Sequence, residues 1–294
     1  MDCYRRHAVV TGTSSGIGRA IALTLARRGL HVFASVRRLA DGESLQQEVS
    51  GQITPLLVDV TCQEQIVDAE AQVRRHVGER GLEVLVNNAG VGLFAPLELV
   101  PLAAFRSQFE INVNGQLAVT QAFLPLIRDA RGRLIMIGSI GDRLTPPFVG
   151  PLSASKHALL ALTQALRLEL APWNIRVVLI EPGNIRSEAG VKFERETAQT
   201  LERLDANGRA LYADAFRSMT SRFAARNQHG SHPQVVADVV ARVIDAPRPR
   251  ARYLVGKDAL LFAMLSWLPA RLLDSILRRA FGLSRRVNGA IKTA

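Results

Sequence analysis

Two patterns of hydrophobic positions follow one another along the chain, short apolar runs and longer segments with a helical repeat, and they predict strands separated by helices. Short runs rich in valine, isoleucine and leucine predict buried strands at residues 7–11, 31–36, 53–58, 83–86, 133–138, 175–180 and 252–255. Between these runs, apolar residues recur at three- and four-residue steps, which predicts helices over residues 16–28, 62–77, 102–128, 153–170 and 232–245. Pro125 is expected to interrupt the third of these helices near its end. This alternation is typical of an α/β fold whose parallel sheet is covered by helices on both faces.

No linker, repeat or low-complexity tract divides the pattern, so we predict one domain over residues 1–256. Within it, the polar segment from about residue 185 to 230 has no strand pattern and predicts a helical flap. Residues 257–294 differ in character, because residues 259–268 are nearly all apolar and the remainder is basic. This extension predicts either packing on the domain or across a dimer, or a surface helix that contacts anionic lipid through residues 259–294.

Composition and charge exclude several classes of protein. A chain of 294 residues that is 48% hydrophobic can bury a sizeable core, which argues against a disordered or fibrous protein. Cys3 and Cys62 provide neither a disulfide framework nor a clustered metal site, so no metal is expected. The net charge of +11 is interpreted as an arginine-rich solvated surface, because no nucleic-acid motif accompanies it. With no signal peptide and no apolar run of spanning length, a cytoplasmic protein is expected.

The first predicted strand runs directly into a glycine-rich turn, Thr11-Gly12-Thr13-Ser14-Ser15-Gly16-Ile17-Gly18. Glycines allow backbone amides to approach a pyrophosphate closely, and the N-terminus of the following helix favours the anion. An ordinary turn with a helix cap would also explain such a cluster. Its place at the first strand-to-helix junction of an α/β series favours a dinucleotide site.

Further motifs along the chain, taken with this turn, resemble the short-chain dehydrogenase/reductase family. They are Asn87-Asn88-Ala89-Gly90, Asn112 in Ile111-Asn112-Val113-Asn114-Gly115, Ser139, Ser153-Ala154-Ser155-Lys156 and Pro182-Gly183-Asn184-Ile185-Arg186-Ser187. The resemblance implies a single doubly wound Rossmann domain with about seven strands, an oxidoreductase acting on a small molecule, and a homodimer or homotetramer. The stretch from Tyr253 through Trp267 to Arg271 looks more loosely like the retinol- and hydroxysteroid-dehydrogenase branch.

The resemblance also implies roles for individual residues. The catalytic set would be Asn112, Ser139 and Lys156, and Lys156 would also hydrogen-bond the nicotinamide ribose. The other residues that would line the dinucleotide, from pyrophosphate through adenine and ribose to nicotinamide, are Gly12, Ser14, Gly16, Ile17, Gly18, Asp59, Val60, Asn87, Ala89, Gly90, Pro182, Gly183 and Ile185. Asp59 could instead cap the helix that follows it.

The end of the second predicted strand bears on which dinucleotide is bound. Enzymes that select NAD usually place a carboxylate there to accept the ribose hydroxyls, and here the residue is Val36. Arg37 and Arg38 follow, and a guanidinium suits a 2′-phosphate. The two arginines could also be merely solvated. We predict NADP(H) as the cofactor, with Arg37 on its 2′-phosphate.

One residue of the family pattern is missing. The family places a tyrosine four residues before the lysine and 13 after the serine, to donate or remove the substrate proton, and both spacings lead to Leu152. Leucine can neither donate nor accept a proton. Tyr212 in the predicted flap could reach the site, although it could equally pack within the flap.

Three interpretations of Leu152 stay open. The protein could be an NADP(H)-dependent oxidoreductase that acts on a lipophilic carbonyl, alcohol or conjugated alkene, with Ser139, Lys156, water or the substrate supplying the proton. It could be a scaffold used for non-redox chemistry such as cyclisation, or for binding only. It could also be an ordinary dehydrogenase with a deliberate substitution at position 152. A lipophilic pocket is predicted from the apolar residues of the expected substrate wall, which could also be ordinary core: Leu93, Phe94, Leu144, Phe148 and Val149.

Overall fold

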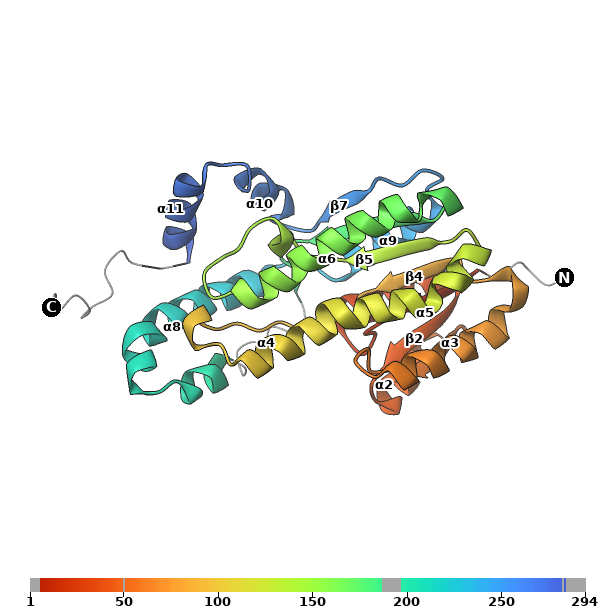
Figure 1. Ribbon diagram of the computed structural model, residues 1–294, viewed down its shortest axis with the longest axis horizontal. Coiled ribbons are helices and arrows are strands. Elements are labelled where there is room, and N and C mark those ends of the chain that lie inside the picture. Colours follow the sequence, from red (N-terminus) through yellow and green to blue (C-terminus); the bar gives the residue numbers. More distant parts are fainter. Residues whose placement is uncertain (1–5, 50, 187–196, 282, 284–294) are drawn as a thin grey trace.

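A parallel sheet of seven strands forms the centre of the computed structural model, which describes residues 6–49, 51–186, 197–281 and 283. The strands follow the order β3-β2-β1-β4-β5-β6-β7 (Figure 1). Their bounds are β1 His7–Val10, β2 His31–Val36, β3 Ile53–Leu57, β4 Val84–Asn87, β5 Arg133–Ile137, β6 Arg176–Pro182 and β7 Arg252–Val255. Because the order changes direction between β1 and β4, a crevice opens at the carboxyl ends of these two strands. The predicted doubly wound fold is confirmed.

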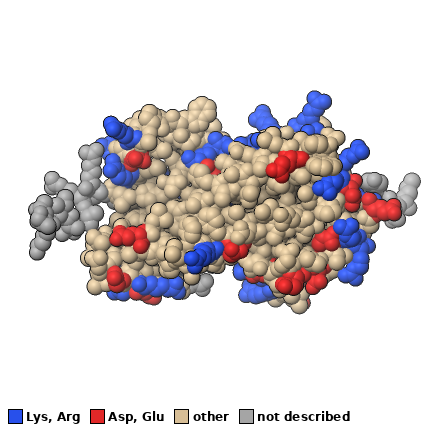
Figure 2. Space-filling model, viewed as in Figure 1, with Lys and Arg blue, Asp and Glu red and all other residues tan. Residues whose placement is uncertain are grey.

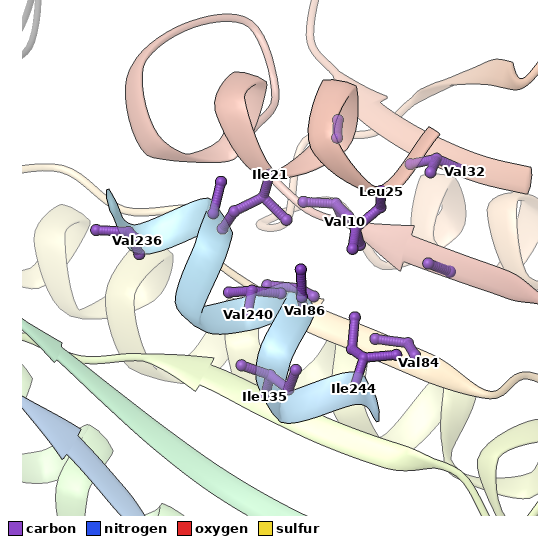
Figure 3. Packing of buried hydrophobic residues seen from close by; sticks show 14 of the residues in the cluster. Val10, Ile21, Leu25, Val32, Val84, Val86, Ile135, Val236, Val240 and Ile244 are labelled. Carbon is purple, nitrogen blue, oxygen red and sulfur yellow. The ribbon is translucent and has the colours of Figure 1, made fainter. Parts of the chain in front are cut away.

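Helices cover both faces of the sheet because both faces of its strands are apolar. On one face lie α1 (Gly16–Arg27), α2 (Leu39–Glu48) and α9 (Gln234–Asp245). Figure 3 shows α9 between α1 and the sheet, with Val240 next to the strand residue Val86 and Ile244 next to Val84. On the other face lie α3 (Gln63–Val77), α5 (Gly115–Asp129) and α6 (Gly150–Glu169).

The helix predicted over residues 102–128 differs from the observed one in two ways. It consists of α4 (Leu102–Phe109), a π-helical turn (Glu110–Asn114) and α5, and the π-helical turn carries Asn112. Pro125 does not interrupt α5, which continues to Asp129. Leu126 and Ile127 are fully buried there, and their packing compensates for the backbone hydrogen bond that proline removes.

Two more differences concern helices beside the site. Helix α6 begins at Gly150 and not at residue 153, so position 152 belongs to its first turn. Helix α2 was not predicted, because its sequence is polar and only Gly42 and Leu45 are buried. In both cases tertiary contacts extend or stabilise a helix that the local pattern marks weakly.

Helices α8 (Ala206–Gln228), α10 (Ala259–Leu265) and α11 (Ala270–Ala280) lie at one end of the molecule, away from α2 and α3 (Figure 1). Helix α8 carries the flap, and α10 and α11 form the extension. Their shared apolar cluster is built on Leu144, Phe216, Met219, Leu277 and Phe281. Residues 187–196 of the predicted flap and 284–294 of the extension lie outside the described residues. The division of the chain at residue 256 stays a prediction.

Candidate active site

The glycine-rich turn after β1 adopts a conformation that only glycine takes readily. Gly12 and Gly16 have φ angles of +67° and +58°. A Cβ on Gly12 would lie 2.9 Å from the Cα of Ala89, and one on Gly18 would lie 2.2 Å from the carbonyl oxygen of Gly12. Side chains at these positions would therefore push apart the turn, the helix and the loop after β4. The turn, the start of α1 and the loop after β4 therefore lie in close contact, which is compatible with the predicted pyrophosphate site.

Asn88, which the sequence interpretation left without a role, ties the turn to the loop after β4. Its side-chain amide donates to the carbonyl oxygens of Thr11 and Gly12 at 2.9 and 3.0 Å. Its backbone N–H and that of Ala89 donate to the hydroxyl of Thr11. The neighbouring Asn87 is fully buried and donates to Thr120 on α5, so its side chain packs inside the protein and does not face the cofactor edge.

The first turn of α1 is suited to an anion. Its N-cap, Ser15, makes no side-chain cap hydrogen bond, and no acidic residue occupies the first turn. The helix therefore presents backbone N–H groups and the positive end of its dipole toward the turn. Ser14 is exposed at the same place. These features fit the pyrophosphate of a dinucleotide.

The end of β2 offers a cation and no carboxylate. Val36 is buried and is followed by the exposed Arg37 and Arg38. Arg38 forms an ion pair with Asp41 at 3.0 Å. In the described part of the chain no carboxylate lies within ion-pair distance of Arg37, although its charge acts on Asp59 from farther away.

Asp59 does not cap the following helix, which begins after Cys62. Its carboxylate instead accepts hydrogen bonds from the backbone N–H and hydroxyl of Thr61, at 2.9 and 2.7 Å. Although burial opposes it, these hydrogen bonds and the charge of Arg37 lower the pKa of Asp59. The anion therefore organises the loop that carries Val60, whose place beside the adenine stays a prediction.

Lys156 reaches the carboxyl end of β5, which leads into Ser139. The Nζ of Lys156 donates to the carbonyl oxygen of Ile137 at 3.0 Å, two residues before Ser139. The ammonium is buried, and burial lowers the pKa of Lys156 to about 8. The hydroxyl of Ser139 accepts a hydrogen bond from Gly141. Lys156 is thus a group that can gain or lose a proton near neutral pH.

Asn112 connects the π-helical turn to the site. Its amide donates to the backbone carbonyl of Val91 and to the hydroxyl of Ser155, and its oxygen accepts from the N–H of Val91. All polar atoms of the Asn112 side chain are therefore engaged within the protein. The residue holds the loop after β4 against α6, next to Lys156.

Leu152 lies on α6 one helical turn before Lys156, so both side chains project from the same side of the helix. Its Cδ2 is 3.7 Å from the position that a Cβ on Gly92 would take. The side chain therefore points to the loop after β4, where the substrate wall was predicted. An apolar group stands at the place that the family pattern gives to a phenol.

Tyr212 is engaged by residues outside the predicted catalytic set. Its hydroxyl donates to the carboxylate of Glu98, and its ring meets that of Phe148 at a centroid distance of 6.3 Å. The hydrogen bond to Glu98 raises the pKa of Tyr212. Of the predicted substrate wall, Leu144 and Val149 are buried, whereas Leu93, Phe94 and Phe148 are partly exposed. Phe94 and Phe148 also make ring contacts with Phe223 and Phe216, and the role of this wall in substrate binding stays a prediction.

A buried ionic cluster behind the site was not predicted. It joins Asp142 and Arg143 after Ser139 to Glu181 at the end of β6 and Arg252 on β7. Arg143 donates to Glu181 at 2.6 and 3.1 Å, and Arg252 donates to both oxygens of the same carboxylate. Only the charge of Glu181 after the apolar run Val177–Ile180 could have signalled the cluster.

Comparisons with known proteins agree with this geometry. A sequence profile of the short chain dehydrogenase family matches residues 6–198. The chain is 36% identical over 277 residues to an NADPH-dependent 3-dehydrocapnine reductase of Ornithobacterium rhinotracheale, covering 92% of this chain and 95% of that protein. It is 33% identical to retinol dehydrogenase 7 of Mus musculus, covering 92% of this chain and 87% of that protein.

Solved structures give the same result. A short-chain dehydrogenase from Streptomyces avermitilis matches with a TM-score of 0.74 and 27% identity, over 95% of both chains. One from Burkholderia cenocepacia, in complex with NADP, matches with a TM-score of 0.69 and 25% identity, over 93% of this chain and 97% of that one. The chain therefore belongs to the short-chain dehydrogenase family, with a likeness to its retinol dehydrogenase branch, and is an oxidoreductase.

Proposed function

We propose that this protein is an NADP(H)-dependent oxidoreductase that acts on a lipophilic carbonyl, alcohol or conjugated alkene and does so without the tyrosine usual in its family. The proposal is carried by one observation: the buried Lys156 donates to the carbonyl oxygen of Ile137 at the carboxyl end of β5, two residues before Ser139. NADP(H) is the cofactor, as a relative's NADPH-dependent activity and NADP-bound relatives support. When bound, it supplies or accepts the hydride.

The residues present would hold this cofactor through distinct groups. The turn from Gly12 to Gly18, with the N-terminus of α1, would bind the pyrophosphate. Arg37 would pair with the 2′-phosphate, and Lys156 would hydrogen-bond the ribose near the nicotinamide. The backbone from Pro182 to Ile185 would flank the nicotinamide ring. These assignments are proposals that follow from the place of each group at the same edge of the sheet.

Arg37→Ala is expected to weaken NADPH binding about 10- to 100-fold, because it removes a charged hydrogen-bond partner of the phosphate. NADH binding should stay within about twofold, since NADH has no 2′-phosphate. Titration of both nucleotides by fluorescence measures these affinities. Arg38→Ala is the matched control, because Arg38 is paired with Asp41 and should matter less. Equal losses for NADPH and NADH in Arg37→Ala would contradict the assignment.

A lipophilic substrate is supported by the apolar surroundings of the site. Leu152, Leu93 and Phe148 are partly exposed there, and the cluster beneath α8 is built from leucine, methionine and phenylalanine. A conjugated alkene would tolerate the absence of tyrosine better than a ketone, because hydride addition to an activated C=C bond needs less direct acid assistance. The relatives named for retinol, a lipophilic alcohol, are consistent with this class.

An exposed apolar stripe on the C-terminal extension supports contact with a membrane surface. In the described part of the chain, no helix is long and apolar enough to cross a bilayer. On α10 and the turn after it, Leu260, Leu261, Met264 and Trp267 are 64%, 50%, 56% and 85% exposed. Figure 2 shows blue Lys and Arg side chains next to an uncharged surface at the upper left, the end of the molecule where Figure 1 places α10 and α11. Apolar groups next to arginines suit the interface of a bilayer that contains anionic lipid.

Replacing Leu260, Met264 and Trp267 together by asparagine is expected to reduce partitioning onto vesicles about 100-fold or more, because each buried apolar side chain contributes about 1.5–3 kcal/mol. Co-sedimentation with phosphatidylcholine vesicles, with and without phosphatidylglycerol, measures this, and the anionic lipid should strengthen binding. Leu168→Asn on α6 is the control for an exposed leucine elsewhere. Unchanged partitioning would contradict membrane contact, and a change in oligomeric state alone would assign the stripe to a second copy. The homodimer or homotetramer implied by the family stays a prediction.

A further inference from the structure

The two carboxylates of the buried cluster receive different numbers of hydrogen bonds. The side chains of Asp142 and Glu181 are both fully buried. Glu181 receives four hydrogen bonds from Arg143 and Arg252. Asp142 receives one long hydrogen bond from Arg252, 3.3 Å to Oδ1, and no donor reaches its Oδ2 among the described residues. An anion in this position would be poorly stabilised.

This inequality favours a proton on Asp142. Burial and the adjacent charge of Glu181 raise the pKa of Asp142 to about 8, and a hydrogen bond between the two carboxyl groups adds to the effect. Arg252 and Arg143 oppose it only in part. Glu181, held by the two guanidinium groups, stays ionised because its pKa is lowered. The cluster therefore carries a neutral acid at its centre.

Asp142 is also fixed directly against the catalytic segment. It ends the short helical turn that begins after Ser139, and its backbone N–H donates to the carbonyl oxygen of Ser139 at 3.0 Å. Its Oδ2 lies 3.2 Å from the position that a Cβ on Gly138 would take. Gly138 is flanked by Ser139 and by Ile137, whose carbonyl oxygen accepts from Lys156. Ionised Asp142 acts on Lys156 by raising its pKa.

The other elements around Asp142 bring few charges to it. Helix α6 contributes Lys156, while its His157 is exposed and contacts the backbone of Ser153. Strands β6 and β7 contribute Glu181 and Arg252. Helix α10, which packs on the same turn, contains no charged residue. Lys156 is therefore the titratable group on the substrate side that Asp142 can influence.

We propose that Asp142 is a positioning residue that controls the charge of Lys156, and that Lys156 delivers the proton which the family takes from tyrosine. The proposal rests on the oxidoreductase function proposed above. In carbonyl reduction, hydride adds to carbon, the C=O π electrons move to oxygen, and oxygen takes a proton from the Lys156 ammonium, leaving a neutral amine. Solvent then returns the proton. A negative Asp142 favours the ammonium, so the lysine stays a proton donor at higher pH than it would alone.

The pH dependence of NADPH binding tests this without requiring turnover, since Lys156 would contact the ribose. Asp142→Asn keeps the size of the side chain and the ability to donate to Glu181, but it cannot become negative. At pH 6 its NADPH affinity should match the unaltered protein within about twofold, because Asp142 is neutral there. At pH 9 its affinity should be about 3- to 10-fold lower, because Lys156 loses its proton earlier. The rate of reduction should show the same alkaline loss wherever a substrate is turned over.

Three variants make the result specific. Glu181→Gln removes the charge that keeps Asp142 neutral. In this variant the loss of NADPH affinity at alkaline pH should therefore occur at a higher pH than in the unaltered protein. Lys156→Met should abolish the pH response altogether. Asp214→Asn, the same chemical change on an exposed aspartate of α8, should leave the profile unchanged.

The outcomes separate the proposal from its alternatives. An equal loss of affinity at pH 6 and pH 9 in Asp142→Asn, or an unchanged profile, would overturn it. Because burial opposes the ionisation of Asp142 and an amide cannot ionise, Asp142→Asn should not lower the thermal midpoint at pH 7.5. A lower midpoint would indicate that Asp142 has a structural role. If Asp142→Asn does not fold, the pH profile of NADPH binding by Glu181→Gln tests the proposal instead. A profile shifted to higher pH would support it, and an unchanged profile would overturn it. A shifted NADPH profile in a protein that reduces no substrate would support the control of Lys156 and contradict the reductase function.

Discussion

Leu152→Tyr is expected to increase ketone reduction by about 10²- to 10⁴-fold, which is the usual contribution of a positioned general acid. The new phenol would stand one helical turn before Lys156, on the same side of α6. The lysine charge would bring the phenol's pKa down from its ordinary value of about 10 toward working pH. Steady-state rates with matched ketones, alcohols and enones measure the effect. The control is Leu152→Phe, which adds the ring without the hydroxyl and should give no such increase.

The same assays distinguish the three interpretations of Leu152. Enone reduction by the unaltered protein should exceed its ketone reduction, since the alkene depends less on acid assistance. Rapid ketone turnover by the unaltered protein would mean that the proton is already supplied efficiently without a phenol, as proposed for Lys156, and Lys156→Met would then be the next variant to measure, with Tyr212→Phe beside it. Bound NADPH with no hydride transfer to any substrate would favour a non-redox or binding function. NADPH affinity should be the same in all three proteins, because the glycine-rich turn does not depend on residue 152.

Glu181→Leu is expected to lower the free energy of unfolding by about 3–5 kcal/mol, the cost of removing one partner from a buried ionic cluster. Arg143 and Arg252 would lose the carboxylate that both contact, and Asp142 reaches only one of them at hydrogen-bond distance. Chemical denaturation at pH 7 measures the change. Glu181→Gln should cost less, because removing the Glu181 charge allows Asp142 to ionise and to take over part of the pairing.

Stability against pH provides a check on the same cluster. Because the pKa of Asp142 is raised in the folded protein, its contribution to stability is fully present below its ordinary pKa and is lost as pH rises toward about 8. Asp142→Asn should therefore remove this decline between pH 5 and pH 8. If the free energy of unfolding declined equally in Asp142→Asn and in the unaltered protein, the decline would have to come from other titratable groups.

The sequence by itself determined the fold class and most of its elements. The central strands are short apolar runs buried on both faces, and such runs are recognisable without knowledge of their neighbours. The glycine-rich turn was equally plain, since the positive φ angles of Gly12 and Gly16 and the close approach to Ala89 are demands that only glycine meets. The gap at Leu152 followed from spacing along one helix and one loop.

Only the tertiary structure decided which side chains face the site. Asn87 and Asn88 are adjacent in the sequence, yet one packs inside against Thr120 and the other holds the glycine-rich turn. The sequence placed Tyr212 in a flap, but its partner, Glu98, lies 114 positions away. Helix α2 forms although its pattern is weak, because the strands beside it supply the surface that it covers.

The ionic cluster is the clearest example of a feature that the sequence alone does not predict. Asp142, Glu181 and Arg252 come from three separate segments, and each looks like an ordinary polar residue in its own stretch of sequence. Their effect on one another depends on burial and on distances of a few ångströms, because electrostatic interactions strengthen as water is excluded. Apolar periodicity and glycine conformation are local properties and can be read along the chain. Charge states near Lys156 arise from contacts between distant segments and exist only once the chain has folded.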